Sequence, residues 1–427
     1  MPMPDRTSRL PGFHALSPAD RLAAVAAFAG LPPETTARLG AGGGLPLAQA
    51  DRMVENVIST MAVPLGIATN FLIDGREVLV PMATEEASVI AAASNAARMC
   101  RATGGIRTST SGPLMMAQIQ ALGMSDPWAA RGRILERREE IAALCDAADP
   151  KLVAAGGGFR DLVVRVIDTA GGPMVVTHIV VDTRDAMGAN AVNTMAEALA
   201  PRLAEWSGGR VSLRIVTNLA DRRLARARTL WPAEAIGGRE VAEAIVAAWH
   251  FALADPYRAA THNKGVMNGV SAVVLATGND TRAVEAGAHA YAALGGQYRP
   301  LARYELAADG GVAGSLEMPL AVGIVGGATR VHPTAQACLR ILGVSTADAL
   351  ARVAVSVGLV QQFAALRALT TEGIQKGHMK LHAQNVAMQA GATGDEIALV
   401  AKAMVARGAV RQDVAEEELR KLRGQAP

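Results

Sequence analysis

Residues 112–217 constrain the fold of this chain more than any other stretch does. Four runs in it have the length and apolar composition of β-strands: 114–122, 161–168, 174–182 and 211–217. Asp126 and Pro127 supply an N-cap and a first helical position after the first run. After the third run, a second helix is predicted by apolar residues at nearly the 3.6-residue period: Met195, Leu199, Leu203 and Trp206. The stretch therefore reads strand–helix–strand–strand–helix–strand.

That order is the split βαβ arrangement of ferredoxin-like domains. Helical patterns dominate before and after it, so we expect an α+β fold in which a compact domain is inserted into a larger, mostly helical one. The expected boundaries divide the chain into four segments: 1–111, 112–217, 218–375 and 376–427. The last segment is helical and could form a mobile cover.

Helix signals flank the inserted domain. Ser17 and Pro18 begin a helix that ends near Gly30, and short helices are expected to continue into residues 51–60. A brief strand at 78–80 precedes a long alanine-rich helix that runs from near Glu86 to just before Gly104. From about residue 218 helices return, and three glycine-rich segments are expected to interrupt them: 265–269, 310–314 and 323–327.

The composition excludes several classes of protein. Half of the 427 residues are hydrophobic, so a large core and two or three domains are expected. A net charge of +3 without a long like-charge run gives no support to a nucleic-acid or membrane-surface role. Three distant cysteines indicate a reducing compartment. Because the N-terminus does not resemble a signal peptide and no apolar run reaches about 18 residues, we expect a soluble cytoplasmic oligomer.

Familiar nucleotide and hydrolase motifs are absent from the sequence. It contains no G-x-G-x-x-G between a strand and a helix, no G-x-x-x-x-G-K-[ST] and no G-x-S-x-G. A Rossmann dehydrogenase, a P-loop enzyme and an ordinary serine hydrolase are therefore disfavoured. His378 and His382 stand four residues apart, but without a third ligand we expect no metal site.

The segment RDAMGANAVNTM (184–195) carries the strongest local signal. It follows a predicted strand and opens a predicted helix, where backbone amides can receive a pyrophosphate. Gly188 permits close approach of a ligand, while Asn190 and Asn193 supply amide donors. By position alone, a tight strand-to-helix turn without a ligand is the commoner interpretation.

The residue order of this segment resembles the DAMGAN cofactor motif of hydroxymethylglutaryl-coenzyme A reductases. Five further segments resemble the same family in its order: ENVIST (55–60), PMATEEASVIAAAS (81–94), DPYRAATHNKGVMNG (255–269), ATGND (276–280) and TEGIQKGHMKLH (371–382). Ser59 replaces a glycine of the family, and His14 stands where relatives use an arginine near the coenzyme A phosphates. The chain is thus similar to the bacterial, soluble class II enzymes over nearly its whole length.

The resemblance implies four catalytic residues. Lys264 would stabilise the negative charge that builds on the carbonyl oxygen. Glu86 would protonate that oxygen during aldehyde reduction, which requires burial or a nearby anion to hold its proton. Asp280 would couple the two, although it could be only a helix N-cap. His378, on a C-terminal flap over 376–427, would protonate the departing coenzyme A thiolate.

Binding residues follow from the same resemblance. The dinucleotide would be held by residues of segment 112–217: Asp149, Asp185, Met187, Gly188, Asn190 and Asn193. An acid at 149 favours NAD over the 2′-phosphorylated cofactor, although an aspartate before Pro150 is also common in turns. Segments 1–111 and 218–375 would form the substrate-binding and dimerisation domain, with four substrate contacts: Ser88, Arg258, Asn268 and Gln361.

The implied reaction interconverts (S)-3-hydroxy-3-methylglutaryl-coenzyme A and mevalonate plus coenzyme A. It needs two hydrides and so two equivalents of NAD(H). NAD preference favours mevalonate catabolism, and a helix expected around Glu55 favours a homodimer or larger assembly with sites between subunits. Two alternatives stay open: a coenzyme A-dependent acyl-transfer or lyase enzyme without redox chemistry, and a non-catalytic oligomeric binding protein.

Overall fold

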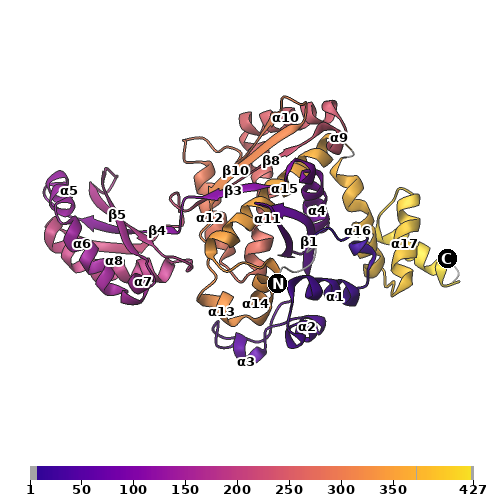
Figure 1. The fold of residues 1–427 in the computed structure, drawn as a ribbon, viewed down its shortest axis with the longest axis horizontal. Helices are drawn as coiled ribbons and strands as arrows, with labels where there is room; N and C mark the ends of the chain where they lie inside the picture. Colours follow the sequence, from indigo (N-terminus) through magenta and orange to yellow (C-terminus); the bar gives the residue numbers. More distant parts are fainter. Residues whose placement is uncertain (1–6, 372, 425–427) are drawn as a thin grey trace.

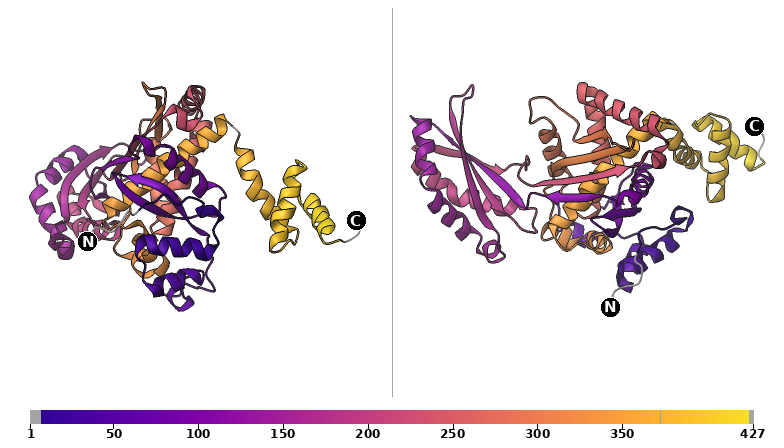
Figure 2. Two further views of the ribbon diagram at one scale, coloured as in Figure 1. Left: turned by 45° about the vertical axis from the view of Figure 1, so that its right-hand side comes forward. Right: turned by 45° about the horizontal axis from the view of Figure 1, so that its top comes forward.

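The computed structural model describes residues 7–371 and 373–424, without the side chains of 374–381. Figure 1 shows an elongated chain in which the β4–β7 unit lies at one end, the mixed body is central and the C-terminal helices lie at the other end. Helices and sheets are both substantial, so the α+β expectation is confirmed. The right view of Figure 2 shows the β4–β7 unit set apart from the body, whereas in the left view the two overlap.

The β4–β7 unit has the predicted strand–helix–strand–strand–helix–strand order. Its sheet runs β5-β6-β4-β7 with every neighbouring pair antiparallel, as in a ferredoxin-like plait. The strands are β4 (Leu114–Leu122), β5 (Gly158–Ile167), β6 (Met174–Asp182) and β7 (Arg210–Val216). The apolar side chains predicted to share one helix face are buried against this sheet, from α8 (Ala189–Ser207). The boundaries at 111 and 217 themselves stay predictions.

Two helices, followed by a short third one, stand where a single helix was expected from Asp126 to about Ala147. They are α5 (Pro127–Leu135), α6 (Arg138–Ala148) and α7 (Pro150–Ala154). Asp126 accepts from the amide of Ala129, so the predicted N-cap is confirmed. The second break falls at Asp149, because Pro150 disfavours a helical conformation at the residue before it.

The chain leaves and re-enters the body through two paired strands. β3 (Arg107–Thr110) leads into the β4–β7 unit, and β8 (Leu224–Trp231) returns from it; Thr110 pairs with Ala225. These strands belong to a sheet of order β3-β8-β10-β9, completed by β9 (Ala302–Leu306) and β10 (Val312–Pro319). The expectation of helices from residue 218 was wrong here, because the alternation of Ala and Arg in LARAR is a period-two pattern.

The expected break at 265–269 does not exist. Gly265 and Gly269 lie inside α11 (Pro256–Ala276), which packs against α15 (Ala347–Thr370). A Cβ on Gly269 would lie 2.8 Å from the carbonyl oxygen of Val357 on α15. Glycine is present for close helix approach rather than to end the helix. Of the other two glycine-rich segments, 310–314 reaches from a turn into β10, and 323–327 is a loop that leads into α13.

The N-terminal region contains a predicted helix and an unpredicted hairpin. Ser17 caps α1 (Pro18–Ala29), as expected. The hairpin of β1 (Leu65–Ile73) and β2 (Arg76–Ala83) extends well beyond the strand expected at 78–80. Residues 51–64 contain only turns and irregular chain, so the helix predicted around Glu55 was wrong. Its Ile58 and Met61 are 93% and 89% exposed, so no apolar face packs within the chain to support a helix there.

The remaining elements surround these units. Near the hairpin lie η1 (Phe13–Ala15), α2 (Pro33–Gly40), α3 (Leu47–Ala50), α4 (Val89–Met99) and η2 (Arg101–Thr103). Later in the body come α9 (Ala233–Ile236), α10 (Arg239–Ala254), α12 (Thr281–Ala292), α13 (Gly327–Val331) and α14 (Pro333–Leu342). The C-terminal helices, with their own small core, are α16 (Ile374–Gln389), α17 (Asp395–Ala406) and α18 (Gln412–Leu422).

Helix α15 forms the centre of the body. Within the described ranges it alone is long and apolar enough to cross a membrane, but 78% of its apolar window is buried inside the fold. Phe363 on this helix stacks on Trp231 of β8, with ring centroids 3.7 Å apart. A helix that is buried to this extent belongs to the core of the fold.

Candidate active site

Glu86, Lys264 and Asn268 meet between the hairpin and α11. Lys264 Nζ lies 2.5 Å from Glu86 Oε2, and Asn268 Nδ2 donates to Glu86 Oε1 over 3.3 Å. Lys264 and Asn268 are one helical turn apart on α11, so their side chains lie on the same face. The lysine and glutamate side chains are 58% and 36% exposed, which leaves the pair open to a ligand. Lys264 therefore lies within α11, next to the interruption that was wrongly expected at 265–269.

Asp280 does not join this pair. Its carboxylate accepts from the amides of Arg282 and Ala283 at 3.0 and 3.1 Å and so caps α12. It also forms a 3.2 Å ion pair with the Arg282 side chain. Among the residues that the structure describes, it makes no hydrogen bond or ion pair with Glu86 or Lys264. The N-cap interpretation of Asp280 is therefore confirmed, and its chemical role stays a prediction.

Arg258 has a guanidinium suited to an anionic ligand. Its amide donates to the Asp255 N-cap in the first turn of α11, which fixes the backbone. Partial burial lowers the pKa of Arg258. Within the described part of the chain the guanidinium has no hydrogen-bond or ion-pair partner. A partly desolvated, unpaired guanidinium is a strong two-pronged partner for a carboxylate.

Two of the predicted substrate residues have buried polar atoms without partners. Ser88 adopts a left-handed conformation with φ 74° ahead of α4, and its Oγ is buried without a hydrogen bond to any described residue. Gln361 on α15 is 5% exposed, and its Oε1 likewise has no hydrogen-bond partner in the described part of the chain. Buried polar atoms are normally paired, so each of these atoms has capacity left for a ligand or water. The α4 helix starts at Val89, later than expected, because Ser88 is not helical.

A buried histidine beside this site escaped the sequence analysis. His262 is completely buried, and its Nδ1 lies 2.9 Å from Nε2 of Gln362. Burial, together with the charge of Arg258, lowers the pKa of His262 to about 3. The imidazole is thus neutral at ordinary pH. The only sequence signal was its position two residues before Lys264.

The DAMGAN segment forms the expected strand-to-helix turn after β6. Gly188 has φ 103° at the start of α8, and a Cβ there would lie 2.5 Å from Cγ2 of Thr183. Arg184 also has positive φ. Asn190 is exposed on the first turn of the helix, while Asn193 Oδ1 accepts from the amide of Val216 and ties α8 to β7. Asn193 is therefore structurally engaged, and its contact with a cofactor stays a prediction.

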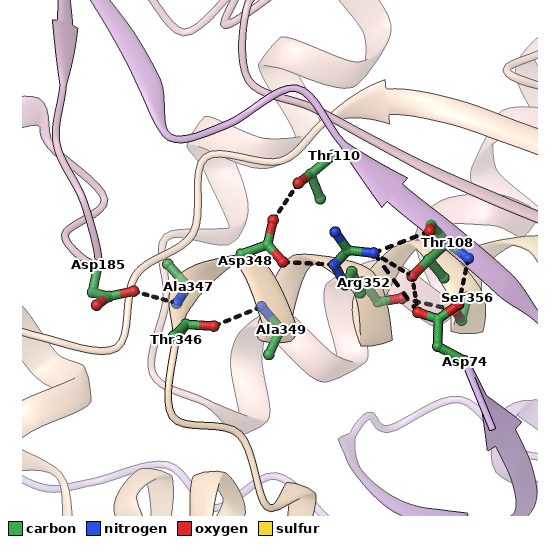
Figure 3. Close-up of polar contacts among 10 residues, drawn as sticks. All are labelled: Asp74, Thr108, Thr110, Asp185, Thr346, Ala347, Asp348, Ala349, Arg352 and Ser356. Atoms are coloured by element: carbon green, nitrogen blue, oxygen red, sulfur yellow. Dashed lines mark hydrogen bonds and ion pairs between the residues drawn. The ribbon is translucent and has the colours of Figure 1, made fainter. Parts of the chain in front are cut away.

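Two predicted cofactor carboxylates also have structural partners. Asp185 accepts from the amide of Ala347 at 2.8 Å, in the first turn of α15, as Figure 3 shows. Asp149 accepts from the amide of Leu152 at 3.0 Å and caps α7. Because a carboxylate has several acceptor positions, neither contact excludes a ligand.

A polar cluster anchors the N-terminal end of α15 in the same region. Arg352 donates to Asp348, one helical turn away, and to Thr108 of β3. Asp348 in turn accepts from Thr110, the last residue before the chain crosses into the β4–β7 unit. Figure 3 shows these contacts beside Asp185. The first turn of α15 is therefore linked to both the DAMGAN segment and the outgoing crossing.

The remaining predicted positions lie elsewhere. His378 falls on the backbone of α16, but its side chain lies outside the described residues. Met187 is half-buried in the DAMGAN segment, and His14 is exposed on η1. A cavity of about 2320 Å³ lies between the N-terminal helices and the hairpin; His14 and Met61 line it, but Glu86 and Lys264 do not. This volume is an open apolar groove of the single chain, distinct from the Lys264 site.

Comparisons with known proteins agree over most of the chain. The family model of hydroxymethylglutaryl-coenzyme A reductase matches residues 17–383. The 3-hydroxy-3-methylglutaryl-coenzyme A reductase of Archaeoglobus fulgidus is 56% identical over 417 residues, 98% of this chain and 95% of the relative. A Streptococcus pneumoniae reductase structure matches with TM-score 0.83 and 39% identity, covering 96% of this chain and 99% of the other. A class II reductase structure from the same organism, bound to NADPH in open conformations, matches with TM-score 0.82 and 39% identity, covering 84% and 99%.

Proposed function

The chain belongs to the hydroxymethylglutaryl-coenzyme A reductase family, and we propose that it interconverts 3-hydroxy-3-methylglutaryl-coenzyme A and mevalonate plus coenzyme A by two NAD(H)-dependent hydride transfers. The observation that carries this proposal is the contact of Lys264 with Glu86 in a solvent-open site. Arg258 lies on the same helix, and its guanidinium has no partner among the described residues. Lys264 would face the reacting oxygen, and Arg258 would hold the free carboxylate of the substrate.

The DAMGAN segment fits a nicotinamide dinucleotide. A diphosphate would lie against the start of α8, where Gly188 removes side-chain bulk and the first-turn amides face outward. Asp185, Met187 and Asn190 would complete the contacts, with Asn193 holding the helix on the sheet. When bound, the dinucleotide supplies hydride chemistry.

Lys264 and Glu86 perform the charge and proton work on the substrate. In the reductive direction, the Lys264 ammonium stabilises the oxyanion that forms from the thioester carbonyl and again from the aldehyde. Glu86 gives the proton that converts the second oxyanion to the alcohol of mevalonate, and Asn268 holds the other carboxylate oxygen in place. In the oxidative direction Glu86 receives that proton.

Asp280 and His378 have proposed roles that depend on rearrangement. Asp280 would turn from capping α12 toward Lys264 and hold its ammonium in register. His378 would move with the C-terminal helices over the site and protonate the coenzyme A thiolate as it leaves. Ser88 and Gln361 would then use their unpaired oxygens for substrate.

Asp149 supports the choice of NAD. Its carboxylate uses one oxygen to cap α7 and keeps the other for a ribose hydroxyl, while its charge would repel a 2′-phosphate. An NAD preference favours mevalonate oxidation as the working direction. The Streptococcus pneumoniae reductase solved with NADPH makes this residue the point to test. In Asp149→Asn the cap is retained but the charge is removed, so discrimination against NADP should fall without loss of stability.

We further propose a cytoplasmic homodimer, or a larger assembly of dimers, with sites between subunits. Residues 51–64 run as irregular, exposed chain beside the open groove, and Ile58 and Met61 are almost fully exposed. A second copy would cover these apolar side chains. Sedimentation at assay concentration should give at least a dimer; an active monomer would contradict this.

A single assay tests the proposed reaction. Mevalonate, coenzyme A and NAD are mixed with the full chain, and absorbance of the reduced nicotinamide is followed; a parallel reaction contains NADP. Growth of the signal that depends on all three components supports the proposal, with the higher kcat/KM expected for NAD. If neither cofactor gives an absorbance change, in the oxidative or in the reductive direction, the proposed reaction is refuted. A clear NADP preference would remove only the cofactor choice.

A further inference from the structure

Arg223 lies at the point where the chain returns from the β4–β7 unit to the body. It directly precedes β8, and its side chain is almost entirely buried, with the whole residue 5% exposed. Nothing in the sequence motifs identified it. A buried arginine normally has an ion-pair partner, so its surroundings require an explanation.

The guanidinium of Arg223 bonds to neutral oxygens of two separate segments. Nη1 donates to Thr183 Oγ1 at 3.0 Å, to the Ala186 carbonyl at 3.1 Å and to the Met187 carbonyl at 2.9 Å. Nη2 donates to the Val322 carbonyl at 2.6 Å. Within the described residues no carboxylate forms a hydrogen bond or ion pair with it. Burial lowers the pKa of Arg223 to about 10, which still leaves it charged at neutral pH.

These bonds determine which way the DAMGAN backbone faces. The peptide bonds here are trans, so each N–H points opposite to the carbonyl of the same peptide group. The Ala186 and Met187 carbonyls point at Arg223, and the amides of Met187 and Gly188 therefore point away from it. Neither amide has an acceptor among the residues described, although Met187 N lies close against Gly323 and Gly188 is buried, so two unpaired donors lie ahead of the first turn of α8.

The same bonds fix this segment against the body. Val322, the fourth partner, belongs to the loop after β10, whose Ile324 amide donates to the Asp185 carbonyl over 2.9 Å. The amide of Gly323, between them, donates to Oδ1 of Asn279 over 2.7 Å. Asn279 is the neighbour of Asp280 in the ATGND segment. Arg223 is thus bonded to both the DAMGAN segment and the loop that joins it to the catalytic half of the chain.

We propose that Arg223 is a positioning residue for the dinucleotide: it turns the DAMGAN carbonyls inward, frees the adjoining amides for the diphosphate and supplies a buried positive charge behind them. This inference rests on the proposed function, because it assumes that the diphosphate is bound there. A diphosphate would add negative charge to that of Asp182 and Asp185, which interact electrostatically with the guanidinium without a hydrogen bond to it, and buried charges of opposite sign interact strongly. Arg223 touches no reacting atom and acts only through the loop.

The test compares Arg223→Met with Arg222→Met. Arg222 is the adjacent, partly exposed arginine, and it pairs with Asp161 rather than with the loop. Calorimetry on the full chain measures the Kd of ADP-ribose, which carries the diphosphate without the nicotinamide. We expect Arg223→Met to raise that Kd about tenfold or more, the effect of losing a charge-assisted contact, and Arg222→Met to leave it unchanged.

Kinetics separate positioning from general damage. In Arg223→Met the KM for NAD should rise in parallel with the ADP-ribose Kd, while the KM for mevalonate and for coenzyme A stay within about twofold. Arg223→Lys keeps the positive charge but lacks the planar set of guanidinium N–H donors. Its Kd for ADP-ribose should therefore lie between those of the wild type and of Arg223→Met. If Arg223→Met fails to fold, Thr183→Val removes one acceptor at constant shape and should weaken ADP-ribose alone.

Two outcomes would overturn the inference while the proposed function survives. One is unchanged ADP-ribose affinity in folded Arg223→Met or, failing that protein, in Thr183→Val. The other is an equal loss of mevalonate, coenzyme A and ADP-ribose affinity, which would indicate a structural role only. Failure of the wild type to bind ADP-ribose and to reduce NAD would instead remove the proposed function, and this inference with it.

Discussion

Nζ of Lys264 lies 2.5 Å from Oε2 of Glu86, although 178 positions separate the two residues in the chain. Both side chains are partly exposed, and ion pairs of that kind contribute roughly 0–1 kcal/mol to stability. Folding therefore gains little from bringing these two charges together. Their proximity is better explained by chemistry on a ligand that enters between them and Asn268.

Loss of the lysine charge should abolish both hydride steps with little change in stability. Lys264→Ala is expected to lower kcat by about a thousandfold, the scale of losing a main oxyanion-stabilising group. Reduced-nicotinamide absorbance with the thioester, and separately with free mevaldehyde, measures the two steps. Arg239→Ala, which removes an exposed cation paired with Glu243, is the control. Activity retained in Lys264→Ala would refute the assignment.

Two substitutions of Asp280 distinguish a role as a helix cap from a role in catalysis. Asn and Asp are both good N-caps, so Asp280→Asn should keep the capping bonds of α12, whereas Asp280→Ala should lose about 1 kcal/mol of stability. If Asp280 also acts on Lys264, both variants are inactive and only Ala is destabilised. A fully active Asp280→Asn protein would leave this residue as a cap alone. Thermal melts and the mevalonate assay give the two readings.

Helix contact between α11 and α15 should be intolerant of a methyl group at Gly269. The added Cβ would meet the Val357 backbone at 2.8 Å, which cannot rotate away, so a loss of about 1–3 kcal/mol is expected. Gly132→Ala in α5 is the matched control, because nothing lies within 4 Å of that Cβ. There alanine should stabilise by about 0.5–1 kcal/mol. Chemical denaturation measures both; equal effects at the two sites would contradict close packing as the reason for Gly269.

His262 should make stability depend on acidity. Its pKa falls from an ordinary value of 6.5 to about 3 on burial, so the folded state binds its proton less readily than the unfolded state does. The neutral imidazole is therefore fully compatible with folding above about pH 6.5, and stability is lost as the pH falls from there toward 3. Between about pH 7 and pH 5 the loss from this residue is about 2 kcal/mol.

His262→Gln isolates that contribution. Unfolding free energies of wild type and variant are compared at about pH 7 and pH 5, and the gap between them should narrow at the lower pH. The comparison with the variant is needed because burial also lowers the pKa of His178, to about 4, and this residue adds its own loss in the same direction. A gap independent of pH would show that His262 can be protonated in place.

Local patterns predicted the β4–β7 unit well because each strand and helix has its own period. Met195 and Leu199 recur at helical spacing and are buried as expected, and the antiparallel order follows from the sequence of elements. The elements of the central body were predicted less well from the sequence. Gly269 was interpreted as a helix break because a sequence does not reveal that another backbone passes close by. Strand β8 was missed because arginines occupy alternate positions in it. Residues 51–64 leave the apolar side chains of Ile58 and Met61 exposed within one chain.

The residues of the candidate site were likewise predicted only in part. The resemblance to a family identified Glu86, Lys264 and Asn268, which the structure brings into contact. It did not identify Arg223, since a buried arginine bonded to backbone carbonyls leaves no spacing or motif to recognise. Nor did it reveal that Asp185 accepts from the amide of Ala347 at the start of α15, because the two residues come together only after folding.

The pairing of β3 with β8 has a consequence for how such a chain could have been assembled. Ser111 and Leu224, the residues on either side of the excursion, are hydrogen-bonded to each other in both directions, through a backbone and a side-chain contact. Excising everything between them would leave a simple hairpin, closed by a short turn, in an otherwise uninterrupted sheet. The β4–β7 unit is thus an insertion closed at its base, and the contact of Lys264 with Glu86 lies wholly outside it.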